Sequence, residues 1–172
     1  MKKYFIVAGE PSGDLHGSKL IKAIKDLNPN SSFMGHGGDS MRNEGMHIIE
    51  HVDSLAIMGF AEVLRHLPRM NKIMRNTVGA IERSKPDRVI LIDYPGFNLR
   101  LAKRLSPLKI PITYFILPQA WAWKQRRVEV LKRFIDQSIS IFPFENDWYK
   151  KHGLRVDYFG HPFVDIEHFN ET

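Results

Sequence analysis

Short apolar runs alternate with amphipathic helical stretches along this 172-residue chain. The first run, residues 4–8, precedes a glycine-rich loop and then apolar residues at a helical spacing, Leu20, Ile24 and Leu27. The pattern recurs with apolar runs at residues 33–35, 88–92, 112–116 and 138–142. This alternation predicts an α/β fold, a Rossmann-like parallel sheet with helices on both faces.

Prolines lie where elements are expected to end, because proline lacks the amide that a continuing helix or central strand needs. These boundary prolines are Pro68, Pro86, Pro107, Pro111 and Pro118. The chain shows no repeat, low-complexity tract or long linker, and its length suits one core. We therefore expect one domain over residues 1–172, with its chemistry in the loops after the strands.

The loop after the first run has the composition of a backbone that passes close to a ligand. Gly9 and Gly13 permit unusual dihedral angles, and Ser12 or Asp14 can cap the following helix, whose amino terminus would favour a phosphate. The loop matches neither the P-loop nor the dinucleotide-binding fingerprint. Glu10 binds sugar hydroxyls, positions a cation, or is a loop-capping acid.

Asp93 directly follows the apolar run at residues 88–92, so a parallel sheet would place it at the edge where ligands bind. It is a candidate general base, provided that partial burial raises its pKa. The alternative is a helix cap. Asn98, five residues later, either binds substrate hydroxyls or caps that helix itself.

Two indoles, Trp121 and Trp123, precede a cluster of cations that includes Arg127. Indole faces pack on sugar rings or acyl chains, and arginine binds phosphate, but the same mixture also suits single-stranded nucleic acid. The structural alternative makes the tryptophans core anchors beside a solvated basic helix. His161, in a Gly-His-Pro sequence, is either a substrate contact or a turn residue.

Residues 57–70 mix large apolar side chains with arginines. They form either a core helix with a solvated basic face or a surface helix on an anionic bilayer, which apolar side chains would enter. The candidate membrane contacts are Ile57, Met58, Phe60, Val63, Leu64, Arg65, Leu67 and Arg69.

Composition narrows the chemistry further. The net charge of +6 and the pI near 9.6 indicate an anionic partner, without choosing among nucleic acid, phosphorylated metabolites and a bilayer. The alternative is that this charge serves solubility alone. The absence of cysteine excludes disulfides, zinc–thiolate sites and a cysteine nucleophile, and fits a reducing compartment. The eight histidines show no metal-ligand spacing, so we expect no cofactor or tightly bound metal.

The first apolar run is too short for a secretory or membrane-spanning segment, so we expect a cytoplasmic protein.

Ordered sequence blocks over nearly the whole chain resemble the lipid-A-disaccharide synthase family, inverting glycosyltransferases of the two-domain GT-B architecture. The blocks are Gly9-Glu10-x-Ser12-Gly13-Asp14-x-x-Gly17, Gly37-Gly38-x-x-Met41-x-x-x-Gly45, Met58-Gly59-x-x-Glu62-Val63-Leu64, Ile92-Asp93-x-Pro95-x-Phe97-Asn98, Trp121-Ala122-Trp123-x-Gln125-x-Arg127, Phe142-Pro143-Phe144-Glu145-x-x-x-Tyr149 and Gly160-His161. The resemblance adds Glu145 to the candidate substrate-binding residues.

The resemblance implies transfer of 2,3-diacylglucosamine from UDP-2,3-diacylglucosamine to 2,3-diacylglucosamine 1-phosphate, which gives the β-1,6-linked disaccharide 1-phosphate and UDP. Inversion needs one displacement and one base, for which Asp93 is the first candidate and Glu10 the alternative or a supporting group. Acylated substrates also favour the bilayer interpretation, with the protein peripheral on the inner face of the bacterial inner membrane.

The chain departs from the family in two ways. Gly96 stands where the family usually carries a second acid, and relatives are roughly twice as long. The resemblance therefore implies an amino-terminal acceptor-side domain that is inactive without a carboxyl-terminal UDP-sugar-binding domain. The alternatives are another GT-B transferase with a lipid-linked acceptor, and a non-enzymatic anion- or RNA-binding module. With the transferase interpretation we expect no nucleic-acid partner.

Overall fold

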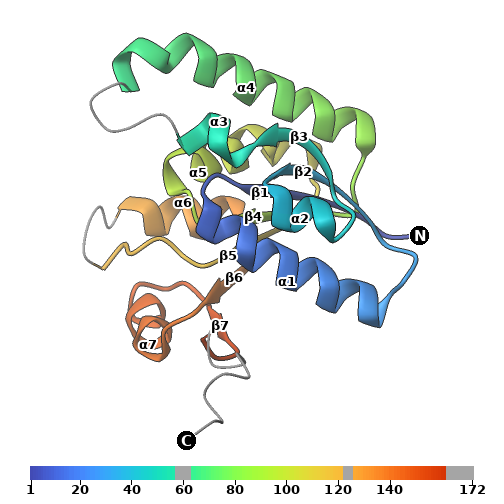
Figure 1. Cartoon of the computed structure of the whole chain (residues 1–172). Coiled ribbons are helices and arrows are strands. Elements are labelled where there is room, and N and C mark those ends of the chain that lie inside the picture. Colours follow the sequence, from blue (N-terminus) through green and yellow to red (C-terminus); the bar gives the residue numbers. More distant parts are fainter. Residues whose placement is uncertain (57–62, 122–125, 162–172) are drawn as a thin grey trace, which may run out of the picture.

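The computed structural model describes residues 1–56, 63–121 and 126–161, except for the side chains of residues 56 and 63–66. Within them, parallel strands form one sheet in the order β3-β2-β1-β4-β5-β6-β7 (Figure 1). The strands are β1 (Lys3–Ala8), β2 (Ser32–Gly37), β3 (His47–His51), β4 (Arg88–Ile92), β5 (Ile112–Phe115), β6 (Gln137–Ser140) and β7 (Asp157–Tyr158). The helices are α1 (Pro11–Leu27), α2 (Asp39–Asn43), α3 (Val52–Ala56), α4 (Val63–Ser84), α5 (Pro95–Leu105), η1 (Ser106–Leu108), α6 (Arg126–Phe134) and α7 (Pro143–Lys151).

This strand order confirms the predicted Rossmann-like parallel sheet. The chain runs outward from β1 to β3 and then crosses back to β4, so β1 and β4 are neighbours in the sheet. Connections leave these two strands in opposite directions, and the crevice beyond their carboxyl ends is where such folds bind ligands. The sequence pattern missed β3 and β7, because neither is a buried apolar run.

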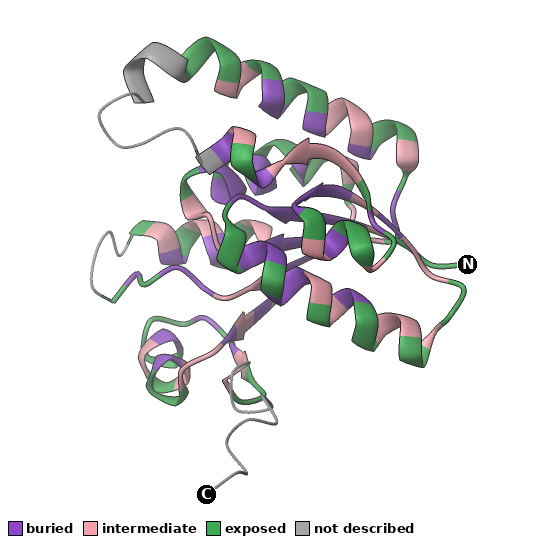
Figure 2. Cartoon of the chain, in the orientation of Figure 1, coloured by how far each residue is buried: buried purple, intermediate pink, exposed green. Residues whose placement is uncertain are grey.

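The central strands are buried beneath the helices (Figure 2). Successive side chains of β1 enter two separate cores. Phe5 and Val7 of β1 pack with helices α4, α5 and α6, whereas Ile6 and Ala8 pack with α1 and α2. Helices therefore cover both faces, as the sequence predicts. The buried face of α1 is different from the expected one, since Gly13, Gly17 and Ile21 are buried while Leu27 is 88% exposed.

Helix α1 has glycine at positions where its neighbours leave little room for a side chain. An ideal Cβ at Gly17 would lie 2.6 Å from the sulfur of Met41 on α2. At Gly13 it would lie 3.2 Å from the Cβ of Ala8 on β1. The absence of side chains at these positions lets α1 approach the sheet closely, at the end that carries the candidate ligand loop.

The expectation that Pro68 ends an element is wrong, because it lies inside α4. A proline at this position removes one helical amide, but the helix is held by tertiary packing further along. Ile73, Met74 and Ile81 are buried against the sheet. The part of α4 around Pro68 and Arg69 is exposed and extends past the core (Figure 2).

A buried hydrogen bond also links α4 to the sheet. The Thr77 hydroxyl donates to the carbonyl of Ile73 at 2.7 Å, so its oxygen is left to accept from Nε2 of His36, 2.9 Å away. His36 on β2 is therefore the neutral Nε2–H tautomer. Burial lowers the pKa of His36 from 6.5 to about 4.

Candidate functional site

A cleft of about 420 Å³ lies beyond the carboxyl ends of the central strands. Its walls come from the start of α1, the loops after β4, β5 and β6, and the start of α6. The lining residues are Ser12, Gly13, His16, Asp93, Pro95, Ile116, Leu117, Pro118, Gln119, Arg127, Ile141 and Phe142. The topology therefore brings together Ser12, Gly13, Asp93 and Arg127, which were candidates from the sequence.

Asp93, which lines this cleft, sits in an unusual backbone turn. It has φ 45° and Tyr94 has φ 47°, so two consecutive non-glycine residues are left-handed. The Asp93 amide donates to the carbonyl of Phe115 on the neighbouring strand at 3.0 Å. This turn breaks the strand direction directly after β4 and begins α5 at Pro95.

The surroundings of Asp93 suit a base. Burial is the largest cause that raises the pKa of its carboxyl, and the negative charge of Glu10 raises it further. The Tyr94 amide and the positive charge of Arg127 act in the opposite direction but leave the pKa above its ordinary value. A carboxylate with a raised pKa is a better proton acceptor than a fully solvated one.

Glu10 is exposed and occupies the N-cap position of α1, which begins at Pro11. No side chain of the described residues caps this helix, so the expectation that Ser12 or Asp14 does so is wrong. The first amides of a helix have no carbonyl partner within it, and here Ser12 and Gly13 of the first turn line the cleft. This end of α1 is therefore suited to an anion.

The Asp14 side chain caps helix α2 and not its own helix α1. Its buried carboxylate accepts the amides of Gly38, Ser40 and Met41 at 2.7–3.0 Å, which are the amides at the start of α2. Asp14 is not among the cleft-lining residues. In this fold the Asp14 oxygens are therefore engaged by the amides at the start of α2.

Asn98 is also structural in this fold. It is fully buried, and its Nδ2 donates to the carbonyls of Asp93 at 2.8 Å and Ile92 at 3.2 Å. It neither caps α5, whose N-cap is Tyr94, nor lines the cleft. Its side chain instead joins the end of β4 to α5 beneath Asp93.

Trp121 lies at the edge of the site and is tied to α7. Its Nε1 donates to Oε1 of Glu145 at 3.2 Å, and its indole is 39% exposed, so it is no core anchor. Glu145 itself is buried, and burial raises the pKa of its carboxyl. Phe144 packs edge-on against the indole and stacks on Phe142, which lines the cleft. Trp123 lies outside the described residues.

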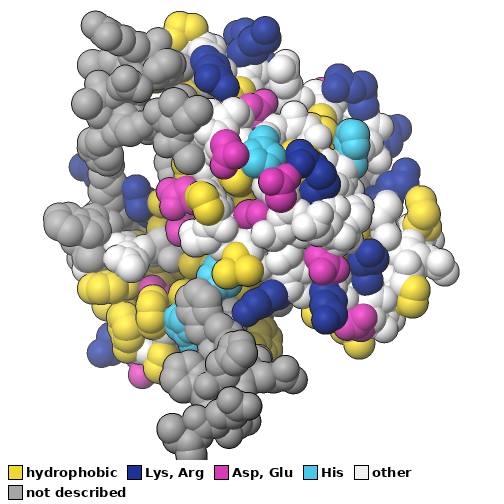
Figure 3. Space-filling view, in the orientation of Figure 1, with side chains coloured by type: hydrophobic (Ala, Val, Ile, Leu, Met, Phe, Trp, Pro, Cys, Tyr) yellow, Lys and Arg dark blue, Asp and Glu magenta, His cyan; other side chains and the backbone are white. Residues whose placement is uncertain are grey.

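The exposed part of this aromatic group contributes to an apolar area over α7, at the lower left of Figure 3. Glu145 takes up the only polar atom of the Trp121 side chain. The solvent-exposed surface of the Trp121 indole is therefore apolar.

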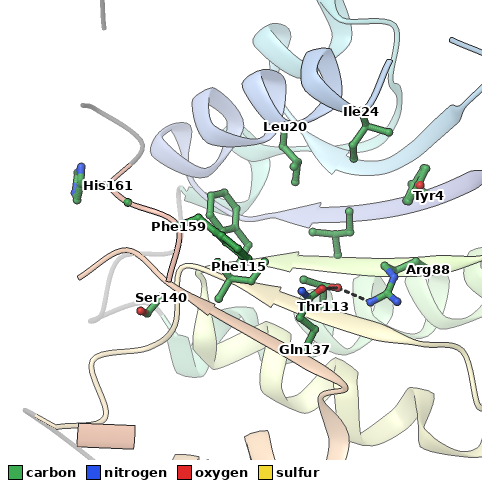
Figure 4. A pocket seen from close by; sticks show the side chains of 13 residues that line it. Tyr4, Leu20, Ile24, Arg88, Thr113, Phe115, Gln137, Ser140, Phe159 and His161 are labelled. Atoms are coloured by element: carbon green, nitrogen blue, oxygen red, sulfur yellow. Dashed lines mark hydrogen bonds between the residues drawn. The ribbon is translucent and has the colours of Figure 1, made fainter. Parts of the chain in front are cut away.

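His161 lines a second hollow of about 390 Å³ and not the Asp93 cleft (Figure 4). This hollow lies over the sheet between α1 and the segment at residues 159–161, with Phe115 and Phe159 inside it. Its polar contact, from Arg88 to the Thr113 hydroxyl at 2.7 Å, lies at the opposite end from His161. His161 packs against Phe142 at 5.5 Å between ring centroids, so it adjoins the cleft from outside.

His16 lines the cleft but was not singled out in the sequence. It lies one helical turn after Ser12, so helical periodicity places both on the same face of α1. Burial, together with the charges of Lys19 and His161, lowers the pKa of His16. At neutral pH it is therefore an uncharged imidazole beside the candidate base.

The candidate membrane segment is only partly described. Ile57, Met58 and Phe60 lie outside the described residues, as do the side chains of Val63, Leu64 and Arg65. Leu67, 40% exposed, and Arg69 project from α4 into solvent. Among the described helices none is long and apolar enough to cross a bilayer. The described side chains also contain no group of three potential metal ligands.

Comparison with known proteins identifies one family. The model of the family "Lipid-A-disaccharide synthetase" matches residues 4–172. A curated relative from Alkalilimnicola ehrlichii, a lipid-A-disaccharide synthase, is 42% identical over 160 residues, which cover 93% of this chain and 42% of the relative. The chain therefore spans less than half the length of this relative.

Solved structures agree on the fold. The Staphylococcus aureus MnaA–UDP structure superposes with a TM-score of 0.71 at 13% identity and covers 100% of this chain and 48% of that one. The MurG structure from Acinetobacter baumannii gives a TM-score of 0.61 at 10% identity, over 94% of this chain and 45% of that one. At these identities the likeness concerns the fold alone, and in both cases it extends over about half of the larger chain.

Proposed function

Since this chain belongs to the lipid-A-disaccharide synthase family, we propose that it is the acceptor-side half of such a transferase, with Asp93 as its general base. The observation that carries this proposal is the half-buried Asp93 carboxylate, which faces Arg127 and the start of α1 in one cleft. A base and an anion-binding surface are the two features that a sugar phosphate acceptor requires.

The proposed reaction is a single displacement. Asp93 takes the proton of the 6-hydroxyl of 2,3-diacylglucosamine 1-phosphate while that oxygen bonds to the anomeric carbon of UDP-2,3-diacylglucosamine. The bond from this carbon to the diphosphate breaks, and UDP leaves with the electron pair. The product is the β-1,6-linked disaccharide 1-phosphate. Glu10 supports the base through its charge, which raises the pKa of Asp93.

The remaining cleft residues suit the acceptor. Arg127 offers a bidentate partner for phosphate, and the first amides of α1 at Ser12 and Gly13 offer further donors. Neutral His16 is placed to exchange hydrogen bonds with sugar hydroxyls. The exposed edge of Trp121 and Phe144 suits a sugar ring or acyl chain that leaves the cleft.

Two further proposals concern partners. The chain spans 42% of its relative, so we propose that a carboxyl-terminal domain binds the UDP-sugar and that this chain alone does not turn over. The exposed Leu67 and Arg69, in a stretch rich in apolar and basic residues, favour contact with an anionic membrane surface that presents the lipid substrates.

A chimera tests the reaction. Residues 4–172 would replace the matching part of the Alkalilimnicola ehrlichii relative, and formation of the disaccharide would be assayed with both acylated substrates. We expect activity in the chimera and none in the isolated chain. Asp93→Asn should lower kcat about 10²- to 10⁴-fold, as loss of general-base catalysis does. Asp39→Asn, an exposed acid on α2, is the matched control.

The pH profile gives a second readout. Because Asp93 must be ionised to act, kcat/KM should fall as the pH drops below its pKa. That pKa is raised, so the acid limb should lie above the range of an ordinary aspartate. Turnover by the isolated chain would disprove the need for a donor-binding domain, and full activity of Asp93→Asn would exclude Asp93 as the base.

A further inference from the structure

The turn that presents Asp93 is conformationally costly. Asp93 and Tyr94 both have φ near 45°, a region that residues with a side chain rarely adopt, and they occupy it consecutively. Such a backbone persists only where the surroundings determine it. The contacts that hold this turn are therefore the ones that decide where the Asp93 carboxylate lies.

The Asp93 carbonyl receives two buried donors. The Tyr114 hydroxyl donates to it at 2.6 Å, and Asn98 Nδ2 donates at 2.8 Å. Tyr114 is fully buried on β5, and burial raises the pKa of its hydroxyl well above 10, so it remains a donor. The next residue of β5, Phe115, accepts the Asp93 amide. Strand β5 therefore holds the turn by hydrogen bonds to both the amide and the carbonyl of Asp93.

The other side of the turn is closed by the Tyr94 ring. It lies against the backbone of Gly9, where an ideal Cβ would come within 2.2 Å of a ring carbon. It also stacks on Phe97, with ring centroids 5.9 Å apart. The ring therefore cannot swing toward β1, and the turn is confined between this loop and β5.

We propose that Tyr114 is a positioning residue for the transferase reaction, because its hydroxyl holds the left-handed turn that keeps the Asp93 carboxylate half-buried in the cleft. It does not touch substrate. Without this hydroxyl, one of two donors is lost and the turn relaxes toward ordinary backbone angles. The carboxylate would then move toward solvent and away from its working position. This inference rests on the proposed role of Asp93.

The test is Tyr114→Phe in the active chimera. We expect kcat to fall about 10- to 100-fold, the usual effect of a small misplacement of a catalytic group, with KM for the acceptor within about twofold. The acid limb of kcat/KM should also move to lower pH, because a more solvated Asp93 loses the burial that raises its pKa. A purely structural role would not shift that limb.

Thr113→Val is the matched control. It removes one buried hydroxyl from the neighbouring position of β5, where Thr113 bonds Arg88 and Gln137 instead of the turn. We expect an unchanged acid limb and unchanged kcat for this variant. Urea unfolding of all variants separates a loss of folded protein from a loss of rate.

Three outcomes are decisive. If Tyr114→Phe keeps wild-type kcat and acid limb while Asp93→Asn is inactive, the inference fails and the proposed base stands. If Asp93→Asn is fully active, the base assignment fails first. Should Tyr114→Phe not fold, Gly9→Ala disturbs the same turn from the Tyr94 side, and an unshifted acid limb in that variant overturns the inference.

Discussion

The Asp14 carboxylate on α1 accepts the backbone amide of Gly38 at 2.7 Å, although the two residues are 24 positions apart. It also accepts two further amides at the start of α2. We expect Asp14→Ala to lower the free energy of unfolding by about 2–4 kcal/mol, since a cap is worth about 0.5–2 kcal/mol and buried amides would lose their acceptor. Urea denaturation of the isolated chain measures this.

Asp39→Ala provides the comparison for Asp14. Asp39 is an acid in the first turn of α2, and its side chain is 74% exposed with Arg42 as its ion-pair partner. Exposed pairs contribute about 0–1 kcal/mol, so this change should be nearly neutral. Equal effects of the two substitutions would contradict the assignment of Asp14 as the cap of α2.

His36 should make stability depend on pH. Its pKa is about 4 in the folded chain and 6.5 as the ordinary value, so the unfolded chain binds the proton first as the pH falls. Stability is then present above pH 6.5 and is lost down to about pH 4. By linkage, the loss between pH 7 and pH 5 is about 2 kcal/mol.

Urea unfolding at several pH values tests the His36 contribution. His36→Gln removes the titrating group, so the slope between pH 7 and pH 5 should flatten relative to wild type. His16, whose pKa is also lowered, leaves a smaller slope of the same sign. His47→Gln, on the exposed side of β3, serves as control and should keep the wild-type slope. If the pH dependence of stability is the same in His36→Gln as in wild type, the pKa of His36 is not lowered in the folded chain and the prediction fails.

Gly96 stands where the resemblance described above implies an acid, and the structure has room for one. A Cβ there would meet no atom of the described structure within 4 Å, and the position lies in the first turn of α5. Gly96→Asp should therefore stabilise the chain by about 0.5–1 kcal/mol, since an acid favours a helix amino terminus and glycine does not favour a helix. A lower melting temperature would contradict this.

Leu67 should take part in membrane contact. We expect the chain to co-sediment with anionic liposomes and Leu67→Asp to weaken that binding, because the change places a charge where apolar surface would enter the bilayer. Leu27→Asp is the matched control, since Leu27 is 88% exposed at the far end of α1. Equal loss in both variants, or binding that is insensitive to salt, would argue against a specific contact through α4.

The candidate site was only partly visible in the sequence. Asp93 was found because an acid after a buried run must lie at the ligand edge of a parallel sheet, and Arg127 because of its motif. His16 was missed, although its spacing from Ser12 placed it on the same helix face. The backbone partners of Asp14 and Asn98 were not visible either, because a polar residue in a loop motif looks the same whether its partner is a ligand or a distant backbone group.

The sequence by itself determined most of the elements, the parallel sheet and the family, because these follow from local periodicity and from ordered motifs. It did not reveal β3 and β7, or that α4 continues through Pro68. Tertiary structure decided which polar groups remain available for chemistry. Asp14 is occupied by α2, whereas Asp93 is held by Tyr114 in a left-handed turn and stays in the cleft. The physical reason is that hydrogen bonds and burial join residues far apart in the chain, and no local pattern records which partner a polar side chain will meet.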